Sequence, residues 1–179
     1  MDQSQLTTPS IRGFEHVTRY MDHDHGIIAA KILPGEYYVT AENEMITTVL
    51  GSCISACVRD REIGLGGMNH LINTILSNGG KRKNLEVKVF GGGKIIPTLS
   101  DVGERNIQFV LEYIDQEGLV LLSQDLGDIY PRKVIYFPKT GKVGMKKVQD
   151  LHHDTIAHRE RQYLTNIKNL PIEGDVELF

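Results

Sequence analysis

The sequence predicts an α/β fold, a compact layered α/β/α sandwich with a mixed, largely antiparallel sheet. Three observations predict it. Short β-branched or alternating segments fill the middle of the chain, amphipathic segments of helical period separate them, and turn signals join neighbouring segments into hairpins. The length of 179 residues suits one domain with a proper core, and a hydrophobic share of 40% is ordinary for a globular protein.

Each expected element has a local signal. Runs of β-branched residues, and alternation of apolar with charged residues, predict strands. The clearest helix covers 100–118, where four aliphatic residues fall on one face, Ser100 and Asp101 offer a start, and Gly118 offers an end. The apolar run at 119–125 predicts a buried strand. In chain order the expected elements are strands at 31–40 (interrupted by a Pro-Gly turn), 45–50, 53–60 and 63–70, a helix at 71–80, a strand at 85–93, a helix at 100–118, a strand at 119–125 and a hairpin at 133–147.

The pair of strands at 53–60 and 63–70 carries a prediction about register. If residues 61–62 form a two-residue loop, Cys53 lies directly opposite His70. Residues directly opposite in an antiparallel pair project from the same face of the sheet. The paired glycines of the second strand invite a bulge, which would shift this register.

The chain divides into three parts. Residues 1–26 are polar and have no sustained period, which predicts a flexible N-terminal extension. Residues 27–149 hold the expected strands and helices and form the predicted domain. Residues 150–179 form a C-terminal tail whose one amphipathic stretch fits either a docking helix or a solvated segment.

Charge and hydropathy exclude several classes of protein. A net charge of −3 and a pI near 6.2 give no electrostatic reason to bind nucleic acid or an anionic membrane. No apolar run is long enough to cross a bilayer, so no membrane insertion is expected. The N-terminal residues lack the basic and apolar regions of a signal peptide. We therefore expect a cytoplasmic protein with reduced thiols.

The cysteines, Cys53 and Cys57, are the first candidates for chemistry. Their spacing misses the Cys-x-x-Cys of redox motifs, and no second pair completes a zinc site. Gly51 and Ser52 precede Cys53 at a strand break, where a sharp turn admits a substrate and aims N–H groups at a developing oxyanion. Cys57 stands in an apolar run and is predicted to be a buried packing residue. By residue type alone, Cys53 is either a nucleophile or a second packing residue.

His70 and Thr47 are the candidates for partners of Cys53. His70 is the histidine embedded in the strand pattern near Cys53, and the alternative is a core histidine with its hydrogen bonds satisfied. The hydroxyl of Thr47 or Thr48 can orient an imidazole, although a strand threonine is more often a packing residue. The histidines in the polar ends lack a third well-placed ligand, so no metal is expected. The "FGGGK" at 90–94 lacks the Ser or Thr of a Walker motif and predicts a tight strand exit.

Five motifs occur in order across most of the chain: "TTVLGSC", "GLGGMNH", "KVFGGGK", "VGERNIQFV" and "DLGDIYPRKVIYFPKTGKV". Together they resemble the chemoreceptor glutamine deamidases, the CheD family of bacterial chemotaxis. The resemblance implies the α/β/α layered fold, with 27–149 as the deamidase domain. It also implies a Cys-His-Thr active site with Cys53 as nucleophile, His70 as base and Thr47 as the third member.

The resemblance further implies an activity and partners. The implied reaction hydrolyses the side-chain amides of selected glutamines on methyl-accepting chemoreceptors to glutamate and ammonia, through a thioester and without a cofactor. The implied partners are the cytoplasmic helices of those receptors and, for some members, a CheC-type chemotaxis phosphatase.

The sequence departs from the family in two places. "GGMNH" is joined directly to "LINTIL", where the family has further strand residues, a variable loop and the first half of a helix. The turn "GDIYPR" is less rich in glycine than is usual in the family. Loss of the segment after His70 would disturb the orientation of its imidazole, on which the rate depends steeply. Two alternatives therefore remain: a non-catalytic adaptor that binds receptor or phosphatase, and a small Cys-His peptidase.

Overall fold

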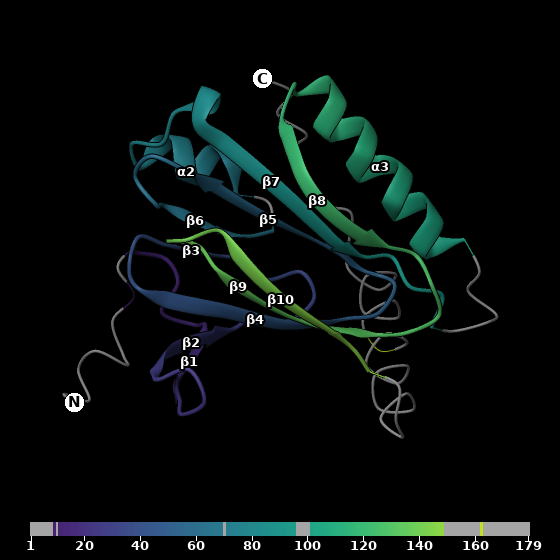
Figure 1. Ribbon diagram of the computed structural model, residues 1–179, viewed down its shortest axis with the longest axis horizontal. Helices are drawn as coiled ribbons and strands as arrows, with labels where there is room; N and C mark the ends of the chain where they lie inside the picture. Colours follow the sequence, from purple (N-terminus) through teal and green to yellow (C-terminus); the bar gives the residue numbers. More distant parts are fainter. Residues whose placement is uncertain (1–8, 10, 70, 96–100, 149–161, 163–179) are drawn as a thin grey trace.

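The structure is a computed structural model, and it describes residues 9, 11–69, 71–95, 101–148 and 162 (Figure 1). The described residues form ten strands in two five-stranded sheets, together with two α-helices and one 3₁₀ turn, η1. This confirms the predicted α/β class and the mixed, largely antiparallel pairing. The layers of the described residues differ from the predicted α/β/α sandwich, because they contain two sheets and not one, and both helices lie outside the second sheet. The elements are β1 (Thr18–Asp22), β2 (Ile27–Lys31), β3 (Tyr38–Thr40), β4 (Glu44–Leu50), β5 (Ile54–Asp60), β6 (Gly66–Met68), α2 (Ile72–Ser77), η1 (Arg82–Asn84), β7 (Leu85–Gly91), α3 (Val102–Gln116), β8 (Val120–Leu126), β9 (Arg132–Phe137) and β10 (Lys142–Lys147).

The two sheets face each other, and the helices lie outside one of them. The first sheet has the strand order β1-β2-β4-β9-β10 and the second the order β3-β6-β5-β7-β8. Two strand pairs are parallel, β2 with β4 and β7 with β8. Buried Ile46 and Tyr136 of the first sheet and Tyr38 and Cys57 of the second share one core. Helices α2 and α3 cover the outer side of the second sheet (Figure 1).

The hairpin of β5 and β6 differs from the predicted one. Cys57 pairs with Met68, so the connection comprises residues 61–64 and not two residues. The predicted pairing of Cys53 directly opposite His70 is therefore wrong. β5 begins only after Cys53 and β6 ends at Met68, while His70 itself lies outside the described residues.

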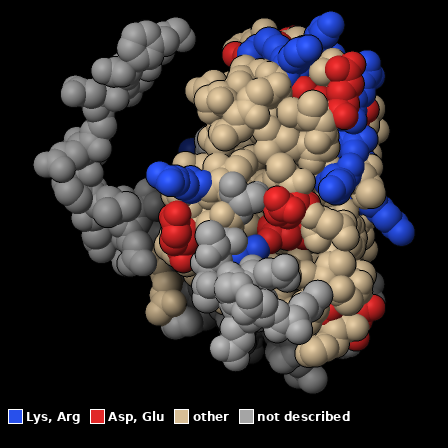
Figure 2. Space-filling view, turned by 90° about the vertical axis from the view of Figure 1, so that its left-hand side faces the viewer, with Lys and Arg blue, Asp and Glu red and all other residues tan. Residues whose placement is uncertain are grey.

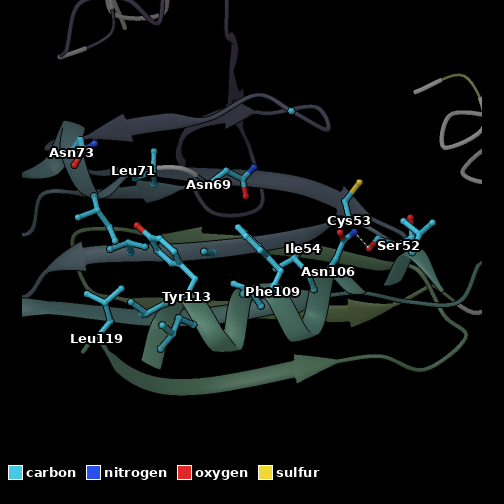
Figure 3. A pocket seen from close by; sticks show the side chains of 18 residues that line it. Ser52, Cys53, Ile54, Asn69, Leu71, Asn73, Asn106, Phe109, Tyr113 and Leu119 are labelled. Atoms are coloured by element: carbon cyan, nitrogen blue, oxygen red, sulfur yellow. Dashed lines mark hydrogen bonds between the residues drawn. The ribbon is translucent and has the colours of Figure 1, made fainter. Parts of the chain in front are cut away.

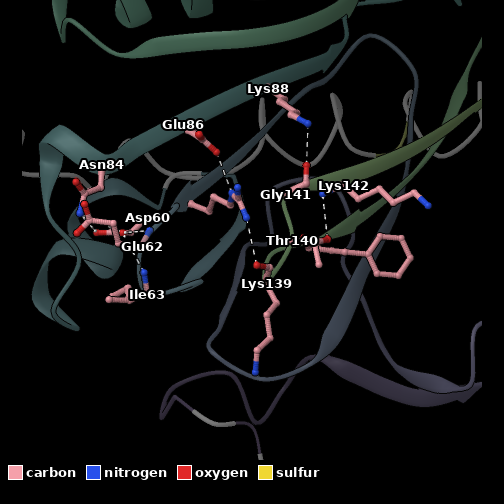
Figure 4. A network of polar contacts seen from close by, with 12 residues as sticks. Asp60, Glu62, Ile63, Asn84, Glu86, Lys88, Lys139, Thr140, Gly141 and Lys142 are labelled. Carbon is pink, nitrogen blue, oxygen red and sulfur yellow. Dashed lines mark hydrogen bonds and ion pairs between the residues drawn. The ribbon is translucent and has the colours of Figure 1, made fainter.

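The side chain of Asp60 explains the longer connection. This fully buried carboxylate accepts hydrogen bonds from the N–H groups of Glu62 and Ile63, at 2.9 and 3.3 Å (Figure 4). It also accepts one from the N–H of Lys81 at 2.7 Å. Burial alone would raise the pKa of Asp60, but the donors outweigh burial and leave the pKa below its ordinary value. Turn propensity alone does not foresee a loop built around a buried carboxylate.

Polar contacts join the two sheets at this end of β5. Arg59 pairs with Glu86 of β7 at 3.0 Å and donates to the carbonyl of Lys139, in the turn between β9 and β10, at 3.2 Å. Lys88 donates to the carbonyl of Gly141 in the same turn at 2.8 Å (Figure 4). These contacts fix the second sheet against the β9–β10 turn, and Cys53 lies at the opposite end of β5.

The run at 119–125 forms β8, but it is not the buried strand that the sequence predicts. β8 is an edge strand of the second sheet, with β7 as its neighbour. Val120 is 56% exposed and Leu122 is 49% exposed. The apolar composition predicted burial, but the position in the sheet decides which faces and edges remain open.

The two ends of the chain differ in what the structure describes. Within residues 1–26, β1 pairs with β2 and the side chain of Phe14 is buried in the core. Arg19 of β1 also forms a buried ion pair with Glu44 of β4. The predicted flexible extension therefore does not hold for this part. The predicted tail at 150–179 lies almost entirely outside the described residues.

Candidate active site

Cys53 lies in the short bend between β4 and β5 (Figure 3). Its side chain is partly exposed, whereas Cys57 is only 1% exposed. Burial raises the pKa of the Cys57 thiol well above its ordinary value. The prediction that Cys57 is a packing residue is confirmed, and Cys53 is the thiol that a substrate can reach.

Hydrogen bonds hold the backbone of this bend from two other elements. The N–H of Gly93 donates to the carbonyl of Gly51 at 2.8 Å, and the N–H of Gly92 donates to that of Cys53 at 3.0 Å. From α3, the side-chain amide of Asn106 donates to the carbonyl of Ser52 at 3.1 Å. All three carbonyls of the bend are therefore anchored, which keeps Cys53 in one position for reaction.

Glycines at the end of β7 allow the backbone there to lie close to the bend at Cys53. The prediction of a tight strand exit at 90–94 is confirmed, because β7 ends at Gly91, where φ is +116°. A Cβ atom on Gly91 would lie 2.1 Å from the carbonyl oxygen of Cys53. A Cβ atom on Gly103, in the first turn of α3, would lie 2.5 Å from the carbonyl oxygen of Gly92. This role of the glycines was not predicted from the sequence, although three successive glycines at a strand end are a signal of close backbone approach.

A buried arginine holds the segment that packs against Gly93. Arg132, at the start of β9, is fully buried and pairs with Asp125 at 2.6 Å. It also donates to the carbonyl of Tyr130 at 3.1 Å. That carbonyl oxygen lies 3.2 Å from the place of a Cβ on Gly93. The burial of Arg132 was not among the predictions from the sequence, which placed this residue in the turn before the strand at 133.

A pocket of about 650 Å³ extends from Cys53 along the outer face of the second sheet, between α2 and α3 (Figure 3). Most of its lining is aliphatic or aromatic, and the polar groups are Ser52, Cys53, asparagine side chains and the hydroxyl of Tyr113. The lining residues are Gly35, Ser52, Cys53, Ile54, Ala56, Val58, Asn69, Leu71, Ile72, Asn73, Val87, Val102, Asn106, Phe109, Val110, Tyr113, Ile114 and Leu119.

Asn69 fixes the chain next to His70. Its backbone is left-handed, with φ of 70°, and its N–H donates to the carbonyl of Ala56 at 2.8 Å. Its side chain donates to the carbonyl of Glu36 and accepts from the hydroxyl of Ser55, each at 2.8 Å. Asn69 was not among the residues predicted from the sequence, although Asn is one of the non-glycine residue types enriched in this backbone conformation. The place of His70 beside Cys53 stays a prediction.

Thr47 lies in the middle of β4 and is buried. It does not line the pocket, and strand alternation turns its side chain to the face opposite that of Ile46. The structure thus places Ser52 and Cys53 at the pocket, with Gly51 behind them in the bend. The assignment of Thr47 as the third member of the site stays a prediction.

No three His, Cys, Asp or Glu side chains among the described residues gather in a way that could hold a metal ion. No helix in the part of the chain that the structure describes has the length and apolar character to cross a membrane.

The chain matches the family model described as "CheD chemotactic sensory transduction" over residues 58–147. It is similar to a protein of Halorhodospira halophila named "Probable chemoreceptor glutamine deamidase CheD". The two are 47% identical over 206 aligned residues, which cover 97% of this chain and 95% of that protein. A protein of Shewanella oneidensis named "Probable chemoreceptor glutamine deamidase CheD 1" is 45% identical over 204 residues, covering 97% and 99%. One of Hahella chejuensis with the same name as the first is 43% identical over 198 residues, covering 95% and 94%.

These alignments are longer than the chain itself. Alignments of 206 and 204 positions exceed 179 residues, so both relatives have residues at positions where this chain has none. The sequence predicts such a shortfall directly after His70. The helix that follows, α2, has only 6 residues.

Proposed function

The chain belongs to the CheD family, and from this premise we propose that it hydrolyses side-chain amides of specific glutamines on methyl-accepting chemoreceptors, giving glutamate and ammonia. The observation that carries the proposal is the anchored bend at Cys53. A partly exposed thiol stands at the end of a pocket, and all three carbonyls of its bend are held by hydrogen bonds. The names of the relatives support the same activity.

In the proposed reaction the thiolate of Cys53 attacks the Cδ atom of the glutamine side chain, and His70 takes the thiol proton. The negative charge that develops on the amide oxygen is stabilised by N–H groups near Ser52 and Cys53. When the tetrahedral intermediate collapses, the C–N bond breaks and His70 returns the proton to the departing ammonia.

The second half of the proposed reaction regenerates the enzyme. His70 removes a proton from a water molecule, which attacks the thioester carbon and releases glutamate and the Cys53 thiol. Thr47 is the proposed orienting group for the imidazole of His70. No step needs a cofactor, and the product leaves a new negative charge on the receptor helix.

The proposed substrates determine where the protein acts and with what. Because they are cytoplasmic helices of chemoreceptors, we expect the reaction to take place in the cytoplasm. A CheC-type phosphatase stays a predicted second partner, by resemblance to the family.

The test is mass spectrometry of a chemoreceptor cytoplasmic fragment incubated with the protein. We expect a gain of about one dalton at discrete glutamines, absent with Cys53→Ala and retained with the matched variant Cys57→Ala. An unmodified receptor that still binds the folded protein would support the adaptor alternative instead, and peptide cleavage would support the peptidase. The residues that this chain lacks relative to its relatives make the adaptor the alternative to exclude first.

A further inference from the structure

The pocket beside Cys53 is a groove without charge, and we refer to it by its lining as the apolar groove. None of the residues that line it is an Asp, Glu, Lys or Arg. Phe109 and Tyr113 of α3 stand in its wall with 67% and 40% of their surfaces exposed. Their rings are stacked, with centroids 6.4 Å apart. Large exposed aromatic side chains along an apolar groove are typical of a surface that binds another molecule.

The apolar groove begins at the candidate nucleophile. Cys53 lies at one end and Leu119 at the other, with α2 beside the Leu119 end (Figure 3). Along α3, Asn106 lies near the Cys53 end, and Tyr113 lies about two turns further on, a distance of roughly 10 Å. The short α2 leaves Phe109, between these two residues, uncovered.

The walls of the apolar groove favour a helix over an extended peptide. An extended peptide binds by joining the free edge of a sheet. Here β5 is paired with β7 along its length and with β6 on its other side, and β7 is paired with β5 and β8. The groove therefore presents side chains and the flank of α3, a surface against which the apolar stripe of an amphipathic helix packs.

We propose that the apolar groove docks an amphipathic helix of the substrate protein and so selects which glutamines are hydrolysed. This rests on the proposed function, because it assigns the groove to the substrate of Cys53. The docked helix places apolar residues against Phe109 and Tyr113, at positions three, four and seven from the target glutamine on one side. Glutamines without such neighbours on the same helix face are poor substrates.

The target glutamine belongs at the end of the docked stripe, not in its middle. Figure 3 shows the sulfur of Cys53 at the end of the groove and turned away from α3, so the glutamine side chain must extend past that end. At the opposite end, Arg82 of η1 pairs with Glu117, just after α3, and Lys81 and Lys83 beside it are exposed. Figure 2 shows several basic side chains at the top of the molecule, with acidic side chains among them. An acidic residue beyond the apolar stripe is therefore favoured on the docked helix.

The test compares two synthetic substrates that both contain one glutamine. One is an amphipathic helical peptide of about 18 residues, or five turns, with leucines three, four and seven positions from the glutamine. The other is a capped tripeptide, too short to reach Phe109. For Phe109→Glu we expect the KM of the helical peptide to rise about tenfold with kcat little changed, and the tripeptide to be hydrolysed as by the wild type. The matched control is Ile63→Glu on the β5–β6 connection, where the replaced side chain is also exposed (52%, against 67% for Phe109), and it should leave the hydrolysis of both substrates unchanged.

Each outcome decides the proposal. If Phe109→Glu lowers hydrolysis of both substrates equally, or of neither, the docking role is wrong. If the wild type releases no ammonia from any substrate, the proposed function fails. The docking role of the apolar groove is then tested by the affinity of the protein for the helical peptide. In that case we measure the fluorescence anisotropy of the labelled helical peptide on Cys53→Ala, with and without Phe109→Glu. A Kd raised about tenfold supports docking, and an unchanged Kd overturns it. Phe109→Ala replaces Phe109→Glu if the charged variant does not fold.

Discussion

Replacing Gly91 with alanine should displace the backbone that carries Cys53, the proposed nucleophile. The new Cβ atom would lie 2.1 Å from the carbonyl oxygen of Cys53. Carbon and oxygen atoms in contact need about 3.3 Å, so the two backbones must separate by about 1 Å. A misplacement of about 1 Å in a catalytic group costs on the order of 100-fold in rate. We therefore expect kcat for receptor deamidation to fall by about two orders of magnitude.

The same substitution also strains the backbone, and this effect needs a control. Gly91 has φ of +116°, a conformation that costs an alanine about 1–3 kcal/mol. Gly79 has φ of +95°, but nothing lies within 4 Å of its would-be Cβ atom. Gly79→Ala therefore carries the strain without the displacement of Cys53.

The assay pairs ammonia release with urea unfolding for both variants. We expect both to lose stability, and only Gly91→Ala to lose kcat while still folded. If folded Gly91→Ala keeps the wild-type kcat, the glycine loop does not position Cys53. An equal loss of kcat in Gly79→Ala would assign the effect to general destabilisation.

Two further predictions concern the thiols and the buried carboxylate. Iodoacetamide should label the folded protein once, at Cys53, as measured by intact mass spectrometry. Labelling of Cys57 in the folded Cys53→Ala variant would contradict the burial of Cys57, which raises the pKa of the Cys57 thiol. Asp60→Asn should lower the free energy of unfolding by about 2 kcal/mol at neutral pH, because an amide in its place cannot accept every hydrogen bond that the carboxylate accepts. Since the folded-state pKa of Asp60 is lowered, its stabilisation is present above the ordinary value of about 3.9 and is lost as the pH falls through the folded value. The difference in the free energy of unfolding between wild type and Asp60→Asn should thus stay level from pH 7 to about pH 4 and narrow at lower pH, and a difference that stays constant down to about pH 2 would contradict this account.

Several features were predictable because their signals are local. Alternation marked β7, the helical period marked α3, and a β-branched run marked β4. The burial of Cys57 was also predictable, because a thiol in an apolar run is usually buried, whereas the residues around Cys53 left both a nucleophile and a packing residue open. The family resemblance, carried by motifs in order, is confirmed by the relatives.

The features that were not predictable depend on residues far apart in the chain. The β5–β6 register follows from Asp60, whose carboxylate binds N–H groups of its own loop and that of Lys81. The exposure of β8 follows from its place at the edge of a sheet, which its composition does not encode. Arg132 is buried in the sheet where it pairs with Leu50 of β4, a strand some eighty residues earlier in the chain.

The sequence by itself determined the class of fold, the elements of regular period and the burial of Cys57. Each of these depends on residue type and on spacings of a few residues. Only the tertiary structure decided that the glycines after β7 and Asn106 of α3 hold the bend at Cys53, and that an uncharged groove leads away from it. Those features come from contacts between segments some forty to fifty residues apart in the chain, and such contacts form only when the sheet and the helix pack together.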